Sequence, residues 1–181
     1  MKGVVKRPNG MAQMKIRPAQ DADIAAINSI FNHEVEHSAP LWIETPVTLA
    51  ERQDWLAARR TDGLPVLVAE ADGQVLGFGS YGPFRHYEGF RPSVEHSVYV
   101  ASTARGQGIG RALLVALIDS ARSQGKKVMV AAVDSENEAS LVLHRAMGFV
   151  ETGRMPRIGE KWGKRRTMVL LQLELAAIAG H

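Results

Sequence analysis

The stretch VEHSVYVASTARGQGIGRALL, from Val94 to Leu114, begins as a strand-like run and continues into a turn that holds three glycines. Alternating glycines beside a strand leave the backbone amides free to approach a bound group closely, because no side chain blocks the approach. A strand, a short loop and the amino end of a helix together offer unpaired N–H groups and a favourable dipole end to an anion. The spacing of Gly106, Gly108 and Gly110 therefore predicts an anion site, and phosphate is the commonest guest of such a site.

Two familiar nucleotide-binding patterns are excluded by the residues around these glycines. The phosphate loop of nucleotide hydrolases needs Lys-Ser or Lys-Thr after its last glycine, whereas Gly110 is followed by Arg111 and Ala112. The dinucleotide fingerprint needs a third glycine three residues after a G-x-G pair, and neither pair here has one.

The length and composition indicate one globular domain. The chain has 181 residues, of which 45% are hydrophobic and 23% charged, with a net charge of +3. It contains no cysteine, which excludes disulfides, thiolate metal sites and a cysteine nucleophile, and no metal site is predicted. No apolar run is long enough to cross a bilayer, and residues 1–13 lack the apolar core of a signal peptide, so we expect a cytoplasmic protein without a membrane contact.

The first half of the chain shows clear helix and hairpin signals. Asp21 is expected to cap a helix whose apolar positions recur at helical spacing as far as Val35. Thr48 and Glu51 form a capping box before a second helix. Asp72-Gly73 is expected to be the two-residue turn of a β-hairpin.

The second half alternates helices with apolar runs. A helix is predicted from Arg111 to Gln124 with Gly125 as its stop, followed by a buried strand over 127–133 and a short helix that ends at Gly148. Two last strands, joined by a basic connector, complete an α/β layered domain with a mixed sheet. Residues 1–13 are interpreted as an extension that is disordered or foreign to the fold, 14–176 as the domain and 177–181 as a tail.

Two motifs together carry a resemblance to a known family. RGQGIG (105–110) after a strand, with NEASLVLHRAMGF (137–149) after the next strand, resembles the acyl-CoA-binding core of the GCN5-related N-acetyltransferase (GNAT) superfamily. FNHEV, LWIETP, EGFR and VEHSVYV are similar to segments of the phosphinothricin and methionine sulfoximine acetyltransferases within it. The resemblance implies a single-domain, mostly antiparallel sheet flanked by helices and splayed at the acyl-CoA-binding strand.

The resemblance also implies acetyl-CoA as co-substrate. Loop amides would hold its pyrophosphate, the strand 98–100 would pair by main chain with the pantetheine arm, and a strand amide would face the thioester carbonyl. The residues alone leave two alternatives open, a glycine-rich turn with no guest and an Asn137 that only caps a helix. The implied cofactor residues are Val98, Tyr99, Val100, Arg105, Gly106, Gln107, Gly108, Ile109, Gly110, Arg111, Asn137 and Ser140.

Acetyl transfer to an amine needs a base, because a protonated amine cannot attack a thioester. In the family a glutamate at the position of Glu95 lines the acceptor pocket and is the usual candidate, whereas by itself a mid-strand glutamate is more often a solvated edge residue. His96 is its nearest rival and is expected on the opposite side of the strand.

The general acid is less defined by the resemblance. Many superfamily members carry a tyrosine four residues before the glycine of the last motif, as proton donor to the departing thiolate. His144 occupies that position here, and either a proton donor or a packed helix residue fits a histidine there.

The acceptor is expected to be a small acid. Arg85, His86 and Tyr87 match the acceptor-binding segment of the phosphinothricin-type enzymes, and a guanidinium can hold a carboxylate or phosphinate at two points, although the segment also fits a solvated loop. No nucleic-acid motif is present, so six basic residues near the C-terminus are interpreted as solubilising a hairpin. Those six are Arg154, Arg157, Lys161, Lys164, Arg165 and Arg166, and the expected acceptor-side residues are Phe31, Arg85, His86, Tyr87, Glu95, His96 and Ser97.

The resulting hypothesis is an acetyl-CoA-dependent N-acetyltransferase for the α-amino group of a small amino acid or analogue, acting by direct attack in a ternary complex. Neither a cysteine nor a nucleophile-elbow serine is present to carry the acetyl group. An enzyme for protein N-termini or another amine, and a non-catalytic acyl-CoA sensor, remain alternatives. The resemblance further implies a homodimer.

Overall fold

The computed structural model describes residues 14–175, so the predicted N-terminal extension and C-terminal tail lie outside the described residues. One seven-stranded sheet runs through the molecule in the order β1-β2-β3-β4-β5-β7-β6. All neighbouring strands are antiparallel except β4 and β5, which confirms the mixed, mostly antiparallel sheet. The strands are β1 (Lys15–Pro18), β2 (Val66–Ala71), β3 (Gln74–Pro83), β4 (Ser93–Val100), β5 (Val128–Asp134), β6 (Val150–Lys161) and β7 (Lys164–Glu174).

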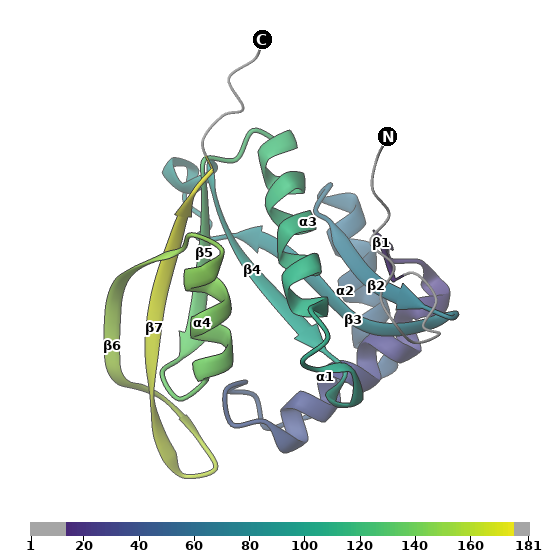
Figure 1. Ribbon diagram of the computed structural model, residues 1–181, viewed down its shortest axis with the longest axis horizontal. Coiled ribbons are helices and arrows are strands. Elements are labelled where there is room, and N and C mark those ends of the chain that lie inside the picture. The colour runs from purple at the N-terminus through teal and green to yellow at the C-terminus, as the bar shows by residue number, and fades with distance from the viewer. Residues whose placement is uncertain (1–13, 176–181) are drawn as a thin grey trace.

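Helices cover both faces of this sheet (Figure 1). One core, which includes Ile27, Phe31 and Leu56, packs the first two helices against the sheet, and a second, which includes Leu117 and Leu141, packs the last two against the other face. No described helix is long and apolar enough to cross a membrane. The helices are α1 (Ile24–His37), α2 (Leu49–Thr61), α3 (Ile109–Ser123) and α4 (Glu138–Ala146), with single 3-10 turns at Asp21–Asp23, Glu88–Phe90 and Ser102–Ala104.

Local sequence signals account for most element ends. The predicted capping box forms, since Thr48 Oγ1 accepts from the Glu51 amide while the Glu51 carboxylate accepts from the Thr48 amide at 2.8 Å. Asp72 and Gly73 both have positive φ, 51° and 75°, as the predicted two-residue hairpin turn requires. Asp21 starts a 3-10 turn instead of capping α1, which begins at Ile24.

The prediction of a basic connector between the last two strands is wrong. β6 and β7 continue through it as one long hairpin that turns at Trp162 and Gly163. Two of its basic residues, Lys161 and Arg166, are 1% and 4% exposed, so they do not solubilise the hairpin. Pairing of β6 with β7 places these cations against partners from α1 and β5, which no local sequence signal indicates.

Candidate functional site

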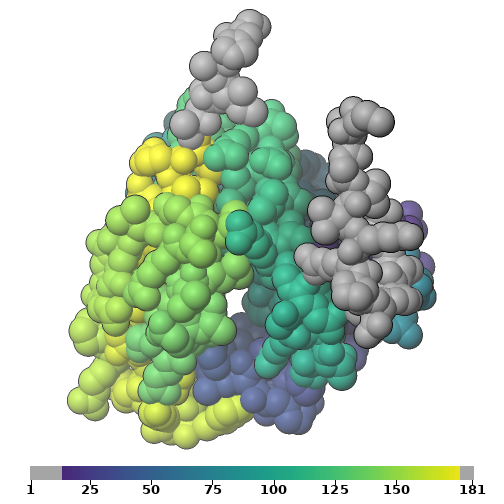
Figure 2. Space-filling view, in the orientation of Figure 1, coloured from purple at the N-terminus to yellow at the C-terminus, as the bar shows by residue number. Residues whose placement is uncertain are grey.

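The parallel pairing of β4 with β5 is short. It covers only Ser93 to Glu95 against Val128 to Val130, after which the two strands diverge, and this confirms the predicted splay. A pocket of about 790 Å³ lies at the divergence, between α3, α4 and the connection from α1 to α2. In Figure 2 it is the hollow between the green surface of α4 and the teal surface of α3, above the blue-violet α1 region.

The glycine loop forms one end of this pocket. Gly108 is the residue before α3, has a φ of 81° and offers no side-chain cap. The first hydrogen bond of the helix is donated by the Ala112 amide to Gly108 O, so the amides of Ile109, Gly110 and Arg111 precede it and have no partner inside the helix. These unpaired donors at a positive dipole end fit an anion.

The predicted cofactor residues gather around the pocket, with one exception. Gln107 is exposed and does not line it. Arg105 lines it while its guanidinium pairs with the Glu34 carboxylate of α1. The lining residues from the predicted set are Val98, Tyr99, Val100, Arg105, Gly106, Gly108, Ile109, Gly110, Arg111, Asn137 and Ser140.

Asn137 is a helix cap as well as a pocket residue. Its Oδ1 accepts a hydrogen bond from the Ser140 amide at 3.2 Å, which is the arrangement that the residues alone suggested. The side-chain Nδ2 of Asn137 makes no hydrogen bond with another described residue, so its two N–H donors remain free at the pocket wall.

Residues 38–41 supply the pocket wall opposite the loop, and no sequence pattern predicted this. The Lys161 ammonium donates to three carbonyls at the end of α1 and beyond it, Val35 O, Ser38 O and Leu41 O, at 2.6–2.7 Å. Trp42 follows, with its Nε1 donating to Asp134 Oδ2 at 2.7 Å. These contacts from β5 and β6 fix the wall.

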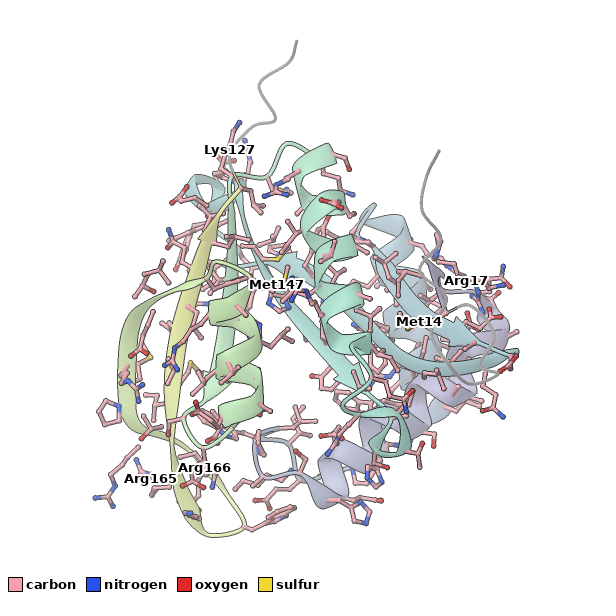
Figure 3. All side chains as sticks on the ribbon, viewed as in Figure 1. Met14, Arg17, Lys127, Met147, Arg165 and Arg166 are labelled. Carbon is pink, nitrogen blue, oxygen red and sulfur yellow. The ribbon has the colours of Figure 1, made fainter. Side chains whose placement is uncertain are left out.

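Close packing at Gly159 and a buried ion pair complete this support. A Cβ at Gly159 would lie 2.3 Å from the Trp42 ring, so only glycine lets the indole pack this closely on β6. Arg166 of β7, labelled in Figure 3, donates to Asp134 at 2.7 Å, and both side chains are almost fully buried.

The two faces of β4 serve different surroundings. Val98 packs against the core below α3 and α4, whereas Tyr99 packs against the core below α1 and α2, as alternation along a strand requires. A second pocket, of about 320 Å³, opens on the α1/α2 face. Ser97 and Tyr99 line both pockets, so the two meet at β4.

Two of the predicted acceptor-side residues, Phe31 and Ser97, line this second pocket. Sequence reasoning missed most of the rest, Arg52, Trp55 and Arg59 of α2 and Phe78 of β3. One signal was present: Arg52 precedes the buried Leu56 by four residues, so an arginine lies on the apolar face of α2.

Glu95 lies on the α1/α2 face of β4, two residues before Ser97. It is half-buried and lines neither pocket. Burial raises the pKa of its carboxyl, and the positive charge of Arg85 opposes that rise. A carboxylate with a raised pKa is a better proton acceptor than an ordinary one.

The loop with Arg85, His86 and Tyr87 is exposed and lines neither pocket. The Arg85 guanidinium donates to Phe84 O at 2.7 Å and lies over the Phe84 ring, with Cζ 4.2 Å from its centroid. Of these three residues, Arg85 is the one whose positive charge acts on Glu95.

His96 and His144 form a buried pair on the α3/α4 side of β4. His144 Nδ1 donates to Ser140 O at 2.6 Å, so its Nε2 accepts from His96 Nε2 at 3.1 Å when the ring is neutral. This leaves His96 Nδ1 buried without a partner among the described residues. Burial lowers both pKa values, that of His96 to about 3, so both rings are neutral at neutral pH.

A family model and several curated relatives match this chain. The model described as Acetyltransferase (GNAT) family matches residues 24–149. The L-methionine sulfoximine/L-methionine sulfone acetyltransferase of Pseudomonas paraeruginosa is 51% identical over 88% of this chain and 94% of its own. The phosphinothricin N-acetyltransferase of Alcaligenes faecalis is 39% identical over 90% of this chain and 83% of its own.

Two solved structures share the fold at high identity. yncA of Salmonella typhimurium, solved with acetyl-CoA, is 47% identical with a TM-score of 0.88, over 92% of this chain and 96% of its own. A ribosomal-protein-alanine N-acetyltransferase from Brucella melitensis is 49% identical with a TM-score of 0.87, over 88% of this chain and 99% of its own.

The histidine pair predicts a stability that falls in mild acid. Both pKa values are lower in the folded than in the unfolded chain, so only the unfolded chain takes up these protons as the pH falls below about 6.5. For His96 alone we expect the free energy of unfolding to fall by about 2 kcal/mol between pH 7 and pH 5. Urea denaturation at both pH values measures this, and a His96→Phe/His144→Phe double variant should lose the dependence. If the double variant shows the same pH dependence of unfolding free energy as the wild type, other titrating groups cause it.

Proposed function

Because the chain belongs to the acetyltransferase (GNAT) family, it is an N-acetyltransferase that uses acetyl-CoA, and we propose that its acceptor is the α-amino group of a small amino acid or analogue. Methionine sulfoximine, methionine sulfone and phosphinothricin are the acceptors that the names of its relatives suggest. The observation that carries the proposal is the meeting of two pockets at Ser97 and Tyr99, beside Glu95.

The larger pocket fits acetyl-CoA. Its glycine loop supplies unpaired amides for the pyrophosphate, and the edge of β4 that faces β5 is unpaired beyond Glu95, so it is free to bond the pantetheine arm as an added strand would. The acetyl group would then lie where β4 diverges from β5, and the acceptor would approach from the smaller pocket on the other face.

In the proposed reaction the acceptor nitrogen attacks the thioester carbonyl carbon directly. Glu95, on the face of β4 that the smaller pocket occupies, takes the ammonium proton directly or through water. The N–C bond forms, the C–S bond breaks, and the CoA thiolate leaves. The absence of cysteine supports direct attack over a covalent acyl-enzyme.

We further propose that His144 protonates the departing thiolate, since it lines the larger pocket. Burial lowers the pKa of His144, so at neutral pH its single ring proton is hydrogen-bonded to Ser140 O, and the ring donates to the thiolate only after its Nε2 has accepted a second proton. His96 is the remaining candidate near the thiolate, because it lines the same pocket and contacts His144.

A homodimer and a cytoplasmic location remain proposals. Exposed apolar side chains on the edge strand β6, Val150, Met155 and Ile158, support an interface on that strand, and sedimentation velocity distinguishes a dimer from a monomer. A second acceptor class, the alanine N-terminus of a ribosomal protein, is favoured by the name of the relative from Brucella melitensis.

A screen of acetyl-CoA consumption tests the acceptor class. We expect turnover with methionine sulfone, methionine sulfoximine or phosphinothricin, and far slower turnover with peptides that begin with alanine. Faster turnover of the peptides would contradict the proposal and favour the protein N-terminus. Release of the coenzyme A thiol, measured with a thiol-reactive maleimide dye after quenching, distinguishes transfer from binding alone.

The cofactor assignment predicts the effect of a charge in the loop. A Cβ at Gly110 meets only ordinary contacts, 3.6 Å from Leu143 and 3.7 Å from Val100, so Gly110→Ala should fold and bind acetyl-CoA. Gly110→Asp should lose acetyl-CoA binding, because its carboxylate lies beside the pyrophosphate at the helix start. Calorimetric titration of both variants measures the difference. Tight binding by a correctly folded Gly110→Asp would place the pyrophosphate elsewhere.

The base assignment predicts a chemical defect without a binding defect. Glu95→Gln should bind acetyl-CoA normally and lower kcat by about 10²- to 10⁴-fold, the usual contribution of a general base. Steady-state kinetics over a range of pH measures this, because loss of the Glu95 carboxyl should also remove the acidic limb of the kcat profile. A kcat close to that of the wild type at neutral pH would transfer the role to water or to another residue.

A further inference from the structure

Arg52 is a buried cation with no anionic partner among residues 14–175. Its residue is 5% exposed, and its Nε is buried without a hydrogen-bond partner in the described part of the chain. The guanidinium lies over two aromatic rings, with Cζ 4.1 Å from the centroid of Phe31 and 4.9 Å from that of Trp55. Burial lowers its pKa, as expected where no carboxylate compensates the charge.

No acid in the described part of the chain forms an ion pair with Arg52. Glu51, the acid that lines the same pocket, has its carboxylate bound to the amide and hydroxyl of Thr48, at 2.8 Å and 2.7 Å. Arg59 adds a second cation, with its Nη1 donating to Tyr81 O at 3.2 Å. The smaller pocket therefore contains two guanidinium groups and one carboxylate, that of Glu51, which forms no ion pair with either.

Uncompensated buried cations are costly, and an anionic ligand that completes their hydrogen bonds removes that cost. A guanidinium held against two aromatic rings has fewer orientations to lose when it binds a carboxylate at two points. Arg85 is also held against one ring, that of Phe84, but it is exposed and lines neither pocket.

We propose that Arg52 binds the carboxylate of the amino-acid acceptor in the smaller pocket and thereby sets the preference for acids over neutral amines. The inference rests on the proposed function for the identity of the ligand as an acceptor. With the carboxylate on Arg52, the α-amino group lies on the face of β4 that carries Ser97 and Glu95, and the acceptor side chain contacts Phe31, Trp55 and Phe78.

The test compares methionine sulfone with its carboxamide, which keeps the amine and side chain but lacks the negative charge. Arg52→Met should raise KM for the acid by about tenfold to a hundredfold, as loss of a charge-assisted hydrogen bond predicts, and change KM for the carboxamide little. KM for acetyl-CoA should stay the same. Arg52→Lys should recover only part of the loss, because lysine lacks the planar fork.

The Tm of Arg52→Met separates a ligand-binding role of Arg52 from a structural one, because the two roles predict opposite changes in Tm. Removal of an uncompensated buried cation should leave the Tm of Arg52→Met equal to or above that of the wild type, whereas a structural arginine would lower it. Arg60→Met is the matched control, since Arg60 lies on the same helix and pairs with Asp21 outside the pocket. It should keep the kinetics of both acceptors.

Two results would overturn the inference: equal losses for acid and carboxamide in Arg52→Met, or an acid-specific loss in Arg85→Ala but not in Arg52→Met. Calorimetric titration of acid and carboxamide into the enzyme saturated with coenzyme A separates this inference from the proposed function. Acid-selective binding that Arg52→Met abolishes, without turnover of any amino acid, would contradict the proposed acceptor and support the carboxylate site. Turnover of amino acids with unchanged acid selectivity in Arg52→Met would support the proposed acceptor and contradict the carboxylate site at Arg52.

Discussion

The site exists because the pairing between β4 and β5 stops after a few residues. Three residue pairs join these strands before they separate, although β4 stays paired with β3 as far as Val100. One edge of β4 therefore has backbone N–H and C=O groups in the middle of a sheet with no strand to satisfy them, and such groups need a partner. Both the glycine loop and α4 lie around this gap, so the pocket follows from an incomplete sheet.

Two buried cations hold the elements around that gap in place. Whether a buried cation has partners within the fold indicates whether its role is structural or ligand-binding. Lys161 has three carbonyl acceptors and Arg166 has Asp134 and Glu136, so each charge is compensated within the fold. Arg52 differs from these two cations, because it is buried and forms no ion pair with a described residue. A cation compensated internally positions the wall of a pocket, whereas an uncompensated one is ready for a ligand.

The sequence patterns correctly predicted those features that depend only on residues close together in the chain. The capping box at Thr48, the turn at Asp72-Gly73 and the glycine loop each depend on a few neighbouring residues, and the structure has all three. Long-range pairing determines the rest. The burial of Lys161 requires β6 to reach the end of α1, more than a hundred residues away in the chain, and the second pocket requires α2 to lie against β3 and β4. Hydrophobic periodicity does not reveal that Arg52 packs on two aromatic rings, since the pattern counts arginine as polar.

Alternation along β4 explains how one strand serves two substrates. Odd-numbered residues from Glu95 to Tyr99 lie on the α1/α2 face, and His96 lies on the other, against His144. An acceptor from one face and a thioester from the gap can thus meet without sharing a pocket. Arg85 fits this arrangement in a role other than a clamp: its charge opposes the rise in the pKa of Glu95 that burial causes. A carboxyl with too high a pKa would hold its proton at neutral pH and accept none from the ammonium group, so an exposed arginine near Glu95 favours the ionised base that the reaction needs.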